Sequence, residues 1–194
     1  GNFFTIDEIF EKSNHFPEEI VAEVLRFYLL STHYRSPIDF SDSSLSEAKT
    51  ALDHFYVAMA TAVAPATAVA PATAEGQLPL GAVGMAESVN KAVTAFGITH
   101  MCTEWKSDLC RRFYGRFEEA MDDDFNTARA MGVLQQFRTE INSKLTDLKR
   151  DNEVSEVLAL FKVIGNVLGI FQVPVTAWSY QPWVSERVAP SMMQ

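Results

Sequence analysis

The sequence predicts an all-α protein: an antiparallel helix bundle with a long Ala/Pro-rich insertion and an irregular C-terminal tail. Apolar side chains recur at every third or fourth residue in several segments, as in helices with one buried face. No segment shows the alternation of a β-strand. Pro residues, which interrupt helices, gather in two places. We therefore expect the bundle to span 17–169, with a low-complexity insertion at 61–84 and a tail at 170–194.

The first helix is predicted from a capping signal. Residues 5–8 read Thr-Ile-Asp-Glu, the spacing at which the Thr and Glu side chains cap the first turn. We expect a short helix through about Lys12, inside a linker that covers 1–16. No secretory signal is present at the start. The chain has no initiator Met and starts abruptly at residues 1–4, Gly-Asn-Phe-Phe, so we expect it to be a piece of a longer protein.

The second helix is expected to begin at Pro17. Pro suits the first helical position, and the acidic residues 18–19 favour the positive end of a helix. Apolar residues surround this segment almost completely, which predicts the central helix of the domain. Pro37 should end it by Ser36 at the latest.

Four later segments also have helical periodicity. They are 45–59, 109–121, 134–148 and 154–168. Ser41 to Ser44 offer caps for the first of them. Asn126 or Asp124 should cap the third, and Gly169 should end the last. A weaker helix is expected near 89–96.

A tandem repeat interrupts the bundle. The unit Ala-Val-Ala-Pro-Ala-Thr occurs at 62–67 and again at 68–73. Its two Pro residues forbid a continuous helix. The composition predicts a low-complexity linker that is extended or disordered.

Charge and cysteine content exclude several classes of protein. The net charge is −9, from 25 acidic and 16 basic residues, so a globally basic nucleic-acid surface is excluded. Basic residues gather at 106–116 and 144–150, the places where phosphates could be met. No apolar run is long enough to span a membrane. Cys102 and Cys110 match no zinc spacing and predict reduced thiols in a cytoplasmic protein.

No specific catalytic motif is present. The sequence has no Gly-x-Gly-x-x-Gly, no P-loop and no Gly-x-Ser-x-Gly. Its four histidines are scattered, and none has a partner that suggests nucleophilic or metal chemistry. We therefore expect no catalytic residue and no metal site in this chain.

An acidic run and one arginine predict structural contacts. Asp122, Asp123 and Asp124 would suit Mg²⁺, but they come just before a helix start at Asn126, where acids act as caps and dipole partners, and we favour that role. Arg26 lies in the most apolar helix, so its guanidinium needs a partner if it is buried. We expect the acidic run to supply that partner and to join two helices.

A polar corner follows the second helix. His33, Tyr34 and Arg35 bring a ring donor, an aromatic face and a guanidinium together where the helix ends. Such a group can meet the phosphate and ribose of RNA. It can equally pack against a neighbouring domain. Arg112 and Arg116 are weaker candidates for phosphate contacts.

These residues carry a resemblance to a known family. Residues 1–5 resemble the stretch after the KMSKS signature of class I aminoacyl-tRNA synthetases. Residues 23–30 are similar to the Asp-Ala-Leu-Arg helix that names the DALR anticodon-binding domain, although Glu23 or Ala22 replaces the Asp. Residues 33–37, 39–41 and 117–127 resemble the cysteinyl-tRNA synthetases in particular. The likeness covers about 1–60 and 108–169.

The resemblance implies a DALR-like bundle that binds tRNA. It implies that a catalytic domain with ATP and zinc sites precedes Gly1, that Gly1 and Asn2 are the edge of the ATP loop, and that an anticodon domain follows Gln194. The parent would attach cysteine to its tRNA, whereas this chain alone would be inactive. The partners of the bundle would be tRNA, the catalytic domain and the anticodon domain. No association with a membrane is expected.

Two alternatives remain open at this point. Cysteine ligases that act on an amino sugar resemble the same family. An acidic protein-interaction module would suit the charge of −9 better than RNA binding does.

Overall fold

The computed structural model describes residues 5–63, 105–150 and 153–183. The helices are α1 (Ile6–Lys12), α2 (Glu18–Leu30), α3 (Asp42–Val63), α5 (Asp108–Asp122), α6 (Thr127–Arg150) and α7 (Val154–Leu168). These residues contain no strand, which confirms the all-α prediction. The predicted helix near 89–96, the repeats beyond residue 63, and Gly1, Asn2 and Cys102 lie outside the described residues.

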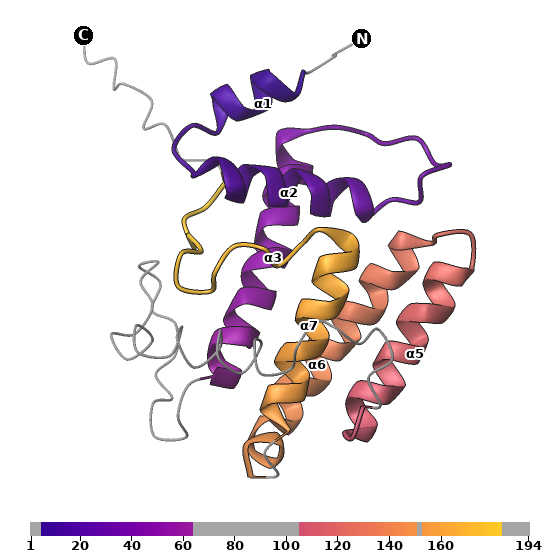
Figure 1. Ribbon diagram of the computed structural model, residues 1–194. Coiled ribbons are helices and arrows are strands. Elements are labelled where there is room, and N and C mark those ends of the chain that lie inside the picture. Colours follow the sequence, from indigo (N-terminus) through magenta and orange to yellow (C-terminus); the bar gives the residue numbers. More distant parts are fainter. Residues whose placement is uncertain (1–4, 64–104, 151–152, 184–194) are drawn as a thin grey trace, which may run out of the picture.

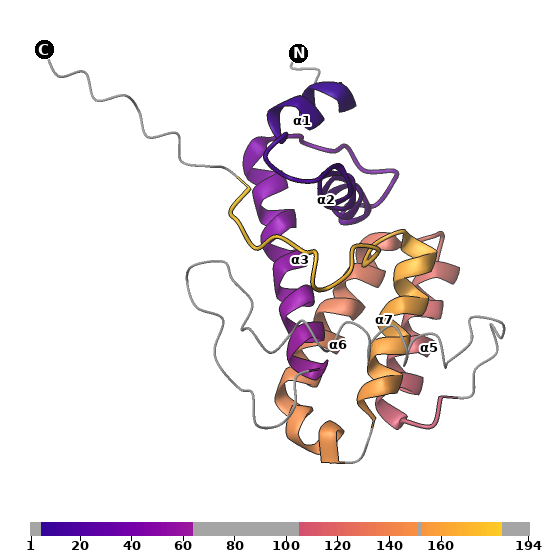
Figure 2. The same ribbon diagram turned by 60° about the vertical axis from the view of Figure 1, so that its left-hand side comes forward.

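Four helices lie side by side and form the body of the molecule (Figure 1). Helices α3 and α6 run in one direction, while α5 and α7 run in the other, so the predicted antiparallel bundle is confirmed. Helix α2 crosses one end of this bundle, with α1 beyond it (Figure 2).

The position of α2 corrects the prediction that it is the central helix. Its inner face is buried through Ile20, Val24 and Phe27, but Arg26 and Leu29 are exposed. The many apolar residues of α2 suggested a helix that is buried on all sides. A helix that lies across the end of a bundle buries only one face. Helix α2 also ends at Leu30, earlier than the limit set by Pro37.

The predicted helix ends are largely confirmed. Thr5 and Glu8 form both hydrogen bonds of the capping box, at 3.2 and 2.8 Å. The Asn126 side chain accepts a hydrogen bond from the amide of Arg129 at 3.0 Å at the start of α6. Gly169 ends α7 with a left-handed φ of +69°. Pro17 lies one residue before α2 instead of at its first position.

An aromatic cluster fills the space between α3, α6 and α7. Phe161 of α7 packs against Phe55 of α3 and Phe137 of α6, with ring centroids 6.1 and 5.1 Å apart. Phe171 joins them from beyond α7, 5.5 Å from Phe161. Such ring pairs add about 0.5–1.5 kcal/mol each beyond area burial.

The segment after α7 is irregular, as predicted, but it belongs to the core. Ile170, Phe171, Trp178 and Trp183 are all buried. The carboxylate of Glu23, which is 1% exposed, accepts hydrogen bonds from three backbone amides of residues 171–173 and from a tyrosine hydroxyl of α3. This contact holds the irregular segment against α2. The sequence-based domain limits themselves stay a prediction.

Candidate nucleic-acid interface

The predicted polar corner lies between two connections. His33, Tyr34 and Arg35 belong to the connection from α2 to α3, and Asp124 belongs to the turn between α5 and α6. The Tyr34 hydroxyl donates to Asp124 Oδ1 at 2.8 Å, and the Arg35 guanidinium meets both oxygens of Asp124 at 3.2 and 3.1 Å. The His33 ring stacks on Tyr34 with centroids 4.8 Å apart. The three predicted residues therefore do form one group.

The turn that supplies Asp124 has an uncommon backbone. Asp124 and Phe125 have φ values of +56° and +51°, which cost side-chain-bearing residues about 1–3 kcal/mol each. Backbone hydrogen bonds from Phe125 to Met121 and from Asn126 to Ala120 hold this turn, at 3.0 and 3.1 Å. Phe125 is 69% exposed at this turn.

The ion pair of Arg35 with Asp124 affects both roles predicted for the polar corner, contact with RNA and packing against a neighbouring domain. Its charge is already balanced by Asp124, and the two side chains remain 67% and 43% exposed. A phosphate would have to compete with this carboxylate. The exposed rings of Tyr34 and Phe125 suit stacking or packing equally well.

The predicted partner of Arg26 is wrong. The Arg26 side chain donates to the backbone carbonyl of Gly169, and Asp123 is paired with Arg129 at 3.4 Å instead. Because α2 crosses the end of the bundle, Arg26 lies at the C-terminal end of α7, where carbonyls lack helical partners and a cation is favoured.

The acidic run also differs from the role predicted for it. Asn126 makes the N-cap hydrogen bond of α6, and Asp124 is committed to Tyr34 and Arg35. Asp122 is the last residue of α5 and is exposed. Asp123 and Asp124 therefore serve as partners of basic and polar side chains across the end of the bundle, in place of N-terminal caps.

A second group of cations lies along α5 and α6. Arg112 donates to Glu140 Oε1 at 2.6 Å, and Lys144 donates to the same oxygen at 2.7 Å. One turn along α5, Arg116 donates to the neutral side chain of Gln136 at 2.6 Å. Within the part of the chain that the structure describes, Arg116 has no carboxylate partner.

This arrangement leaves positive charge on an acidic protein. Arg112, Arg116 and Lys144 carry three charges, and Glu140 balances one of them. The pKa of Glu140 is lowered, chiefly by its hydrogen bond from Lys144; burial opposes this effect, and Arg112 lowers the pKa further. Arg112 and Arg116 are one helical turn apart, about 6 Å along the axis. We call these three cations the α5–α6 basic face.

Lys144 was not predicted as a site residue. Lys144 is one of the basic residues at 144–150 that the charge pattern identifies. Its position beside Arg112 could not be predicted, because it depends on how α5 packs against α6. The side chains of Lys149 and Arg150 lie outside the described residues.

No group of three His, Cys, Asp or Glu side chains in the described ranges could hold a metal ion. These residues therefore do not fit a zinc site. No helix in the same ranges is long and apolar enough to cross a membrane.

Comparisons with known proteins agree on one family. Residues 116–172 match the model of the DALR domain. The chain is 35% identical to the cysteine–tRNA ligase of Geobacter metallireducens over 97% of its own length and 37% of that protein. It is 39% identical to the enzyme of Geotalea uraniireducens and 38% identical to that of Geobacter sulfurreducens, over 88% of the chain in both cases and 31% and 29% of those proteins. The chain thus spans about a third of the length of these relatives.

Proposed function

The chain belongs to the cysteine–tRNA ligase family, and from this premise we propose that it is the helix bundle that binds tRNA in such an enzyme. Its relatives are named as ligases that join cysteine to tRNA. The bundle would contact the tRNA and hold it at a fixed distance from the catalytic domain. A helix the length of α6, 24 residues, extends about 36 Å, which suits this spacer role.

The observation that carries the proposal is the α5–α6 basic face. A protein with a net charge of −9 repels RNA over most of its surface, so contact needs a local excess of cations. Arg112, Arg116 and Lys144 supply such an excess on one face.

The polar corner has a secondary place in the same proposal. His33, Tyr34 and Arg35 would meet ribose and phosphate, with Arg35 exchanging Asp124 for a phosphate. Arg35→Ala in the full-length enzyme should weaken tRNA binding and reduce its salt dependence. Unchanged affinity and salt dependence would reassign the corner to packing against a neighbouring domain.

We place the ligase reaction in parts of the full-length enzyme other than this bundle. We propose that ATP activates cysteine, and that zinc selects it, in the parts of the full-length enzyme that lie outside this chain. An anticodon domain would be a further partner, and the enzyme would be cytoplasmic. The 194-residue chain should neither turn over ATP nor charge tRNA. Turnover by the purified chain would contradict this assignment.

The decisive experiment is the affinity of the chain for a cysteine tRNA transcript at several salt concentrations. We expect weak binding whose logarithm falls linearly with the logarithm of salt, because only a few phosphates are neutralised. No binding at low salt would favour the acidic interaction module. Neither the family model nor the relatives support the amino-sugar ligase.

A further inference from the structure

We propose that the pocket between the N-terminal part of α5 and the C-terminal half of α6 holds one backbone phosphate of the bound RNA, and that Glu140 competes with that phosphate for Arg112 and Lys144. The pocket is lined by Asp108, Leu109, Arg111, Arg112 and Lys144 and has a volume of about 390 Å³. This inference rests on the proposed function and assigns its site.

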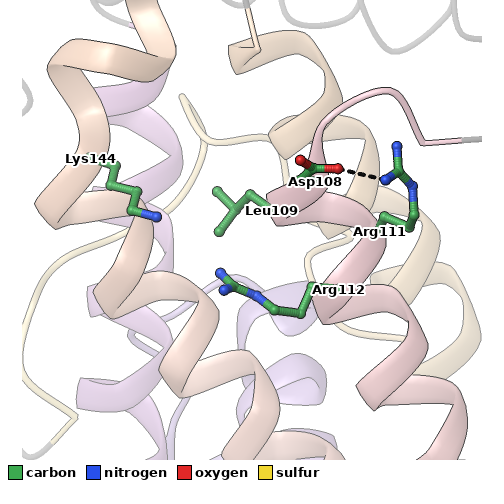
Figure 3. A pocket seen from close by; sticks show the side chains of 5 residues that line it. All are labelled: Asp108, Leu109, Arg111, Arg112 and Lys144. Atoms are coloured by element: carbon green, nitrogen blue, oxygen red, sulfur yellow. Dashed lines mark hydrogen bonds and ion pairs between the residues drawn. The ribbon is translucent and has the colours of Figure 1, made fainter.

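The cations of the pocket face a shared space. Figure 3 shows Arg112 extending from α5 and Lys144 from α6 toward the same region, with Leu109 beside them. Both side chains are about half exposed, at 54% and 50%. A ligand can therefore reach them without any rearrangement of the helices.

Arg111 forms the wall of the pocket and is not available as a ligand. Its guanidinium donates to the carbonyl of Trp105 at 2.9 and 3.2 Å and pairs with Asp108 at 2.5 Å. These contacts fix the chain that leads into α5. The charge of Arg111 is balanced by Asp108, so the anion would be held by Arg112 and Lys144 alone.

The charge balance indicates one anionic group. Arg112 and Lys144 share a single oxygen of one carboxylate, Glu140 Oε1. Two cations on one carboxylate leave one positive charge unmatched. A phosphodiester carries one negative charge and accepts charge-assisted hydrogen bonds from both a guanidinium and an ammonium. It therefore matches the pocket in charge and in hydrogen-bonding chemistry.

The size of the effect of Glu140→Gln on RNA affinity separates two possible roles of Glu140. If Glu140 only joins α5 to α6, Glu140→Gln should raise RNA affinity no more than Glu19→Gln does, because each variant only removes one negative charge from an acidic protein. If Glu140 competes with a phosphate, Glu140→Gln should raise the tRNA affinity by about fivefold at low salt, the effect of one charge at about 4 Å in water. Lys144→Gln should lower the affinity by a similar factor and reduce the salt slope by about one.

The experiment measures binding of the 194-residue chain to a cysteine tRNA transcript from low to moderate salt. Lys162→Gln on α7 is the matched control, because Lys162 contacts only the neutral Gln172, at 3.4 Å, among the described residues, and should leave affinity unchanged. Thermal unfolding of each variant shows whether it is folded. A second measurement follows the backbone amides of Leu109 and Lys144 by NMR during titration with inorganic phosphate, which should shift both.

The outcomes separate this inference from the proposed function. If the wild-type chain binds tRNA but Glu140→Gln and Lys144→Gln leave affinity and slope unchanged, the pocket assignment is overturned and the proposed function stands. Shifts with inorganic phosphate but no change in tRNA affinity would mean a small-anion site only, and would also overturn it. If the wild-type chain binds no tRNA, both fail.

Discussion

Arg35 and Asp124 lie 89 residues apart in the sequence, yet the guanidinium of one meets both carboxylate oxygens of the other at 3.2 and 3.1 Å. The contact joins the connection after α2 to the turn before α6. It brings together two segments for which the sequence alone predicts separate roles, an RNA-binding corner and a set of helix caps. The same carboxylate also accepts the hydroxyl of Tyr34.

We expect this pair to contribute little to stability. Both side chains are substantially exposed, so water and salt screen the attraction, and the coupling free energy should be below about 1 kcal/mol. A double-mutant cycle with Arg35→Gln and Asp124→Asn, followed by urea unfolding, measures it. Asn is chosen because it tolerates the positive φ of Asp124. A coupling of 2 kcal/mol or more would show that the corner is a structural contact of the bundle.

Glu23 should matter far more for stability than the exposed acidic residues of α2. Its buried carboxylate accepts hydrogen bonds from Tyr56 and from the amides of Phe171 and Gln172, at 2.8, 2.8 and 2.9 Å. Glu23→Gln keeps the shape but turns one acceptor into a donor, so at least one buried donor loses its partner, at a cost of about 2–3 kcal/mol.

Urea unfolding measures this cost, with Glu19→Gln as the control. Glu19 is exposed on the same helix, so the control should stay within about 0.5 kcal/mol of the wild type. Amide exchange at Phe171 and Gln172 should also quicken in Glu23→Gln. Equal stability of the two variants would mean that the segment after α7 is held by its apolar side chains alone.

The features that the sequence predicts correctly are those with local causes. The capping box at Thr5, the N-cap at Asn126 and the left-handed Gly169 each depend on residues within one helical turn. Helical periodicity likewise locates the segments of the bundle, because it reports which face of each helix is buried. Local signals therefore identify the elements, but they do not say how the elements pair.

The features that were missed or wrong depend on pairing between distant segments. Arg26 reaches Gly169 and not the acidic run, because α2 crosses the bundle end. Lys144 meets Arg112 only because α5 packs against α6. Glu23 accepts amides almost 150 residues away, at a position where its side chain has no local partner. Only the tertiary arrangement contains this information.

Acid should remove the contribution of Glu140 to stability. Its pKa is lower in the folded chain than its ordinary value, mainly because of Lys144, so its stabilising effect is present above the ordinary pKa. That effect is lost as the pH falls through the lowered value. Urea midpoints of the wild type and of Glu140→Gln should therefore differ near pH 7 and converge as the pH falls through the lowered pKa. A difference that does not shrink on acidification below the ordinary pKa would show that the ion pairs are not its cause.

Cys110 should be unreactive in the folded protein. Burial, followed by the nearby charge of Glu156, raises the pKa of the thiol to about 12. At pH 8 only about one molecule in ten thousand would then carry the reactive thiolate. In a Cys102→Ser variant, a thiol reagent at pH 8 should label the native chain very slowly and the urea-unfolded chain rapidly. Fast labelling of the native chain would mean that α5 opens readily.

Two glycines on successive helices should respond to the same substitution with opposite signs. On α6, a Cβ added at Gly132 would meet no atom within 4 Å, so Gly132→Ala should stabilise the chain by about 0.5–1 kcal/mol through helix propensity. On α7, a Cβ at Gly165 would lie 2.5 Å from the carbonyl oxygen of Ile170. That oxygen belongs to the chain that leaves α7, whose position is fixed by the hydrogen bond from the Ile170 amide to the Gly165 carbonyl at 3.0 Å.

Gly165→Ala should therefore destabilise the protein by about 1–3 kcal/mol even though Ala is the better helix former, because the backbone of the segment after α7 must move. Thermal unfolding of the two variants beside the wild type makes the comparison, and Gly132→Ala serves as the matched control for the change of residue type. The close contact exists only if the chain turns back over α7 immediately after Gly169. If Gly165→Ala raised the melting temperature as Gly132→Ala does, the segment from Ile170 would not lie against the last turns of α7, and the packing of Phe171 on Phe161 would have to be rejected with it.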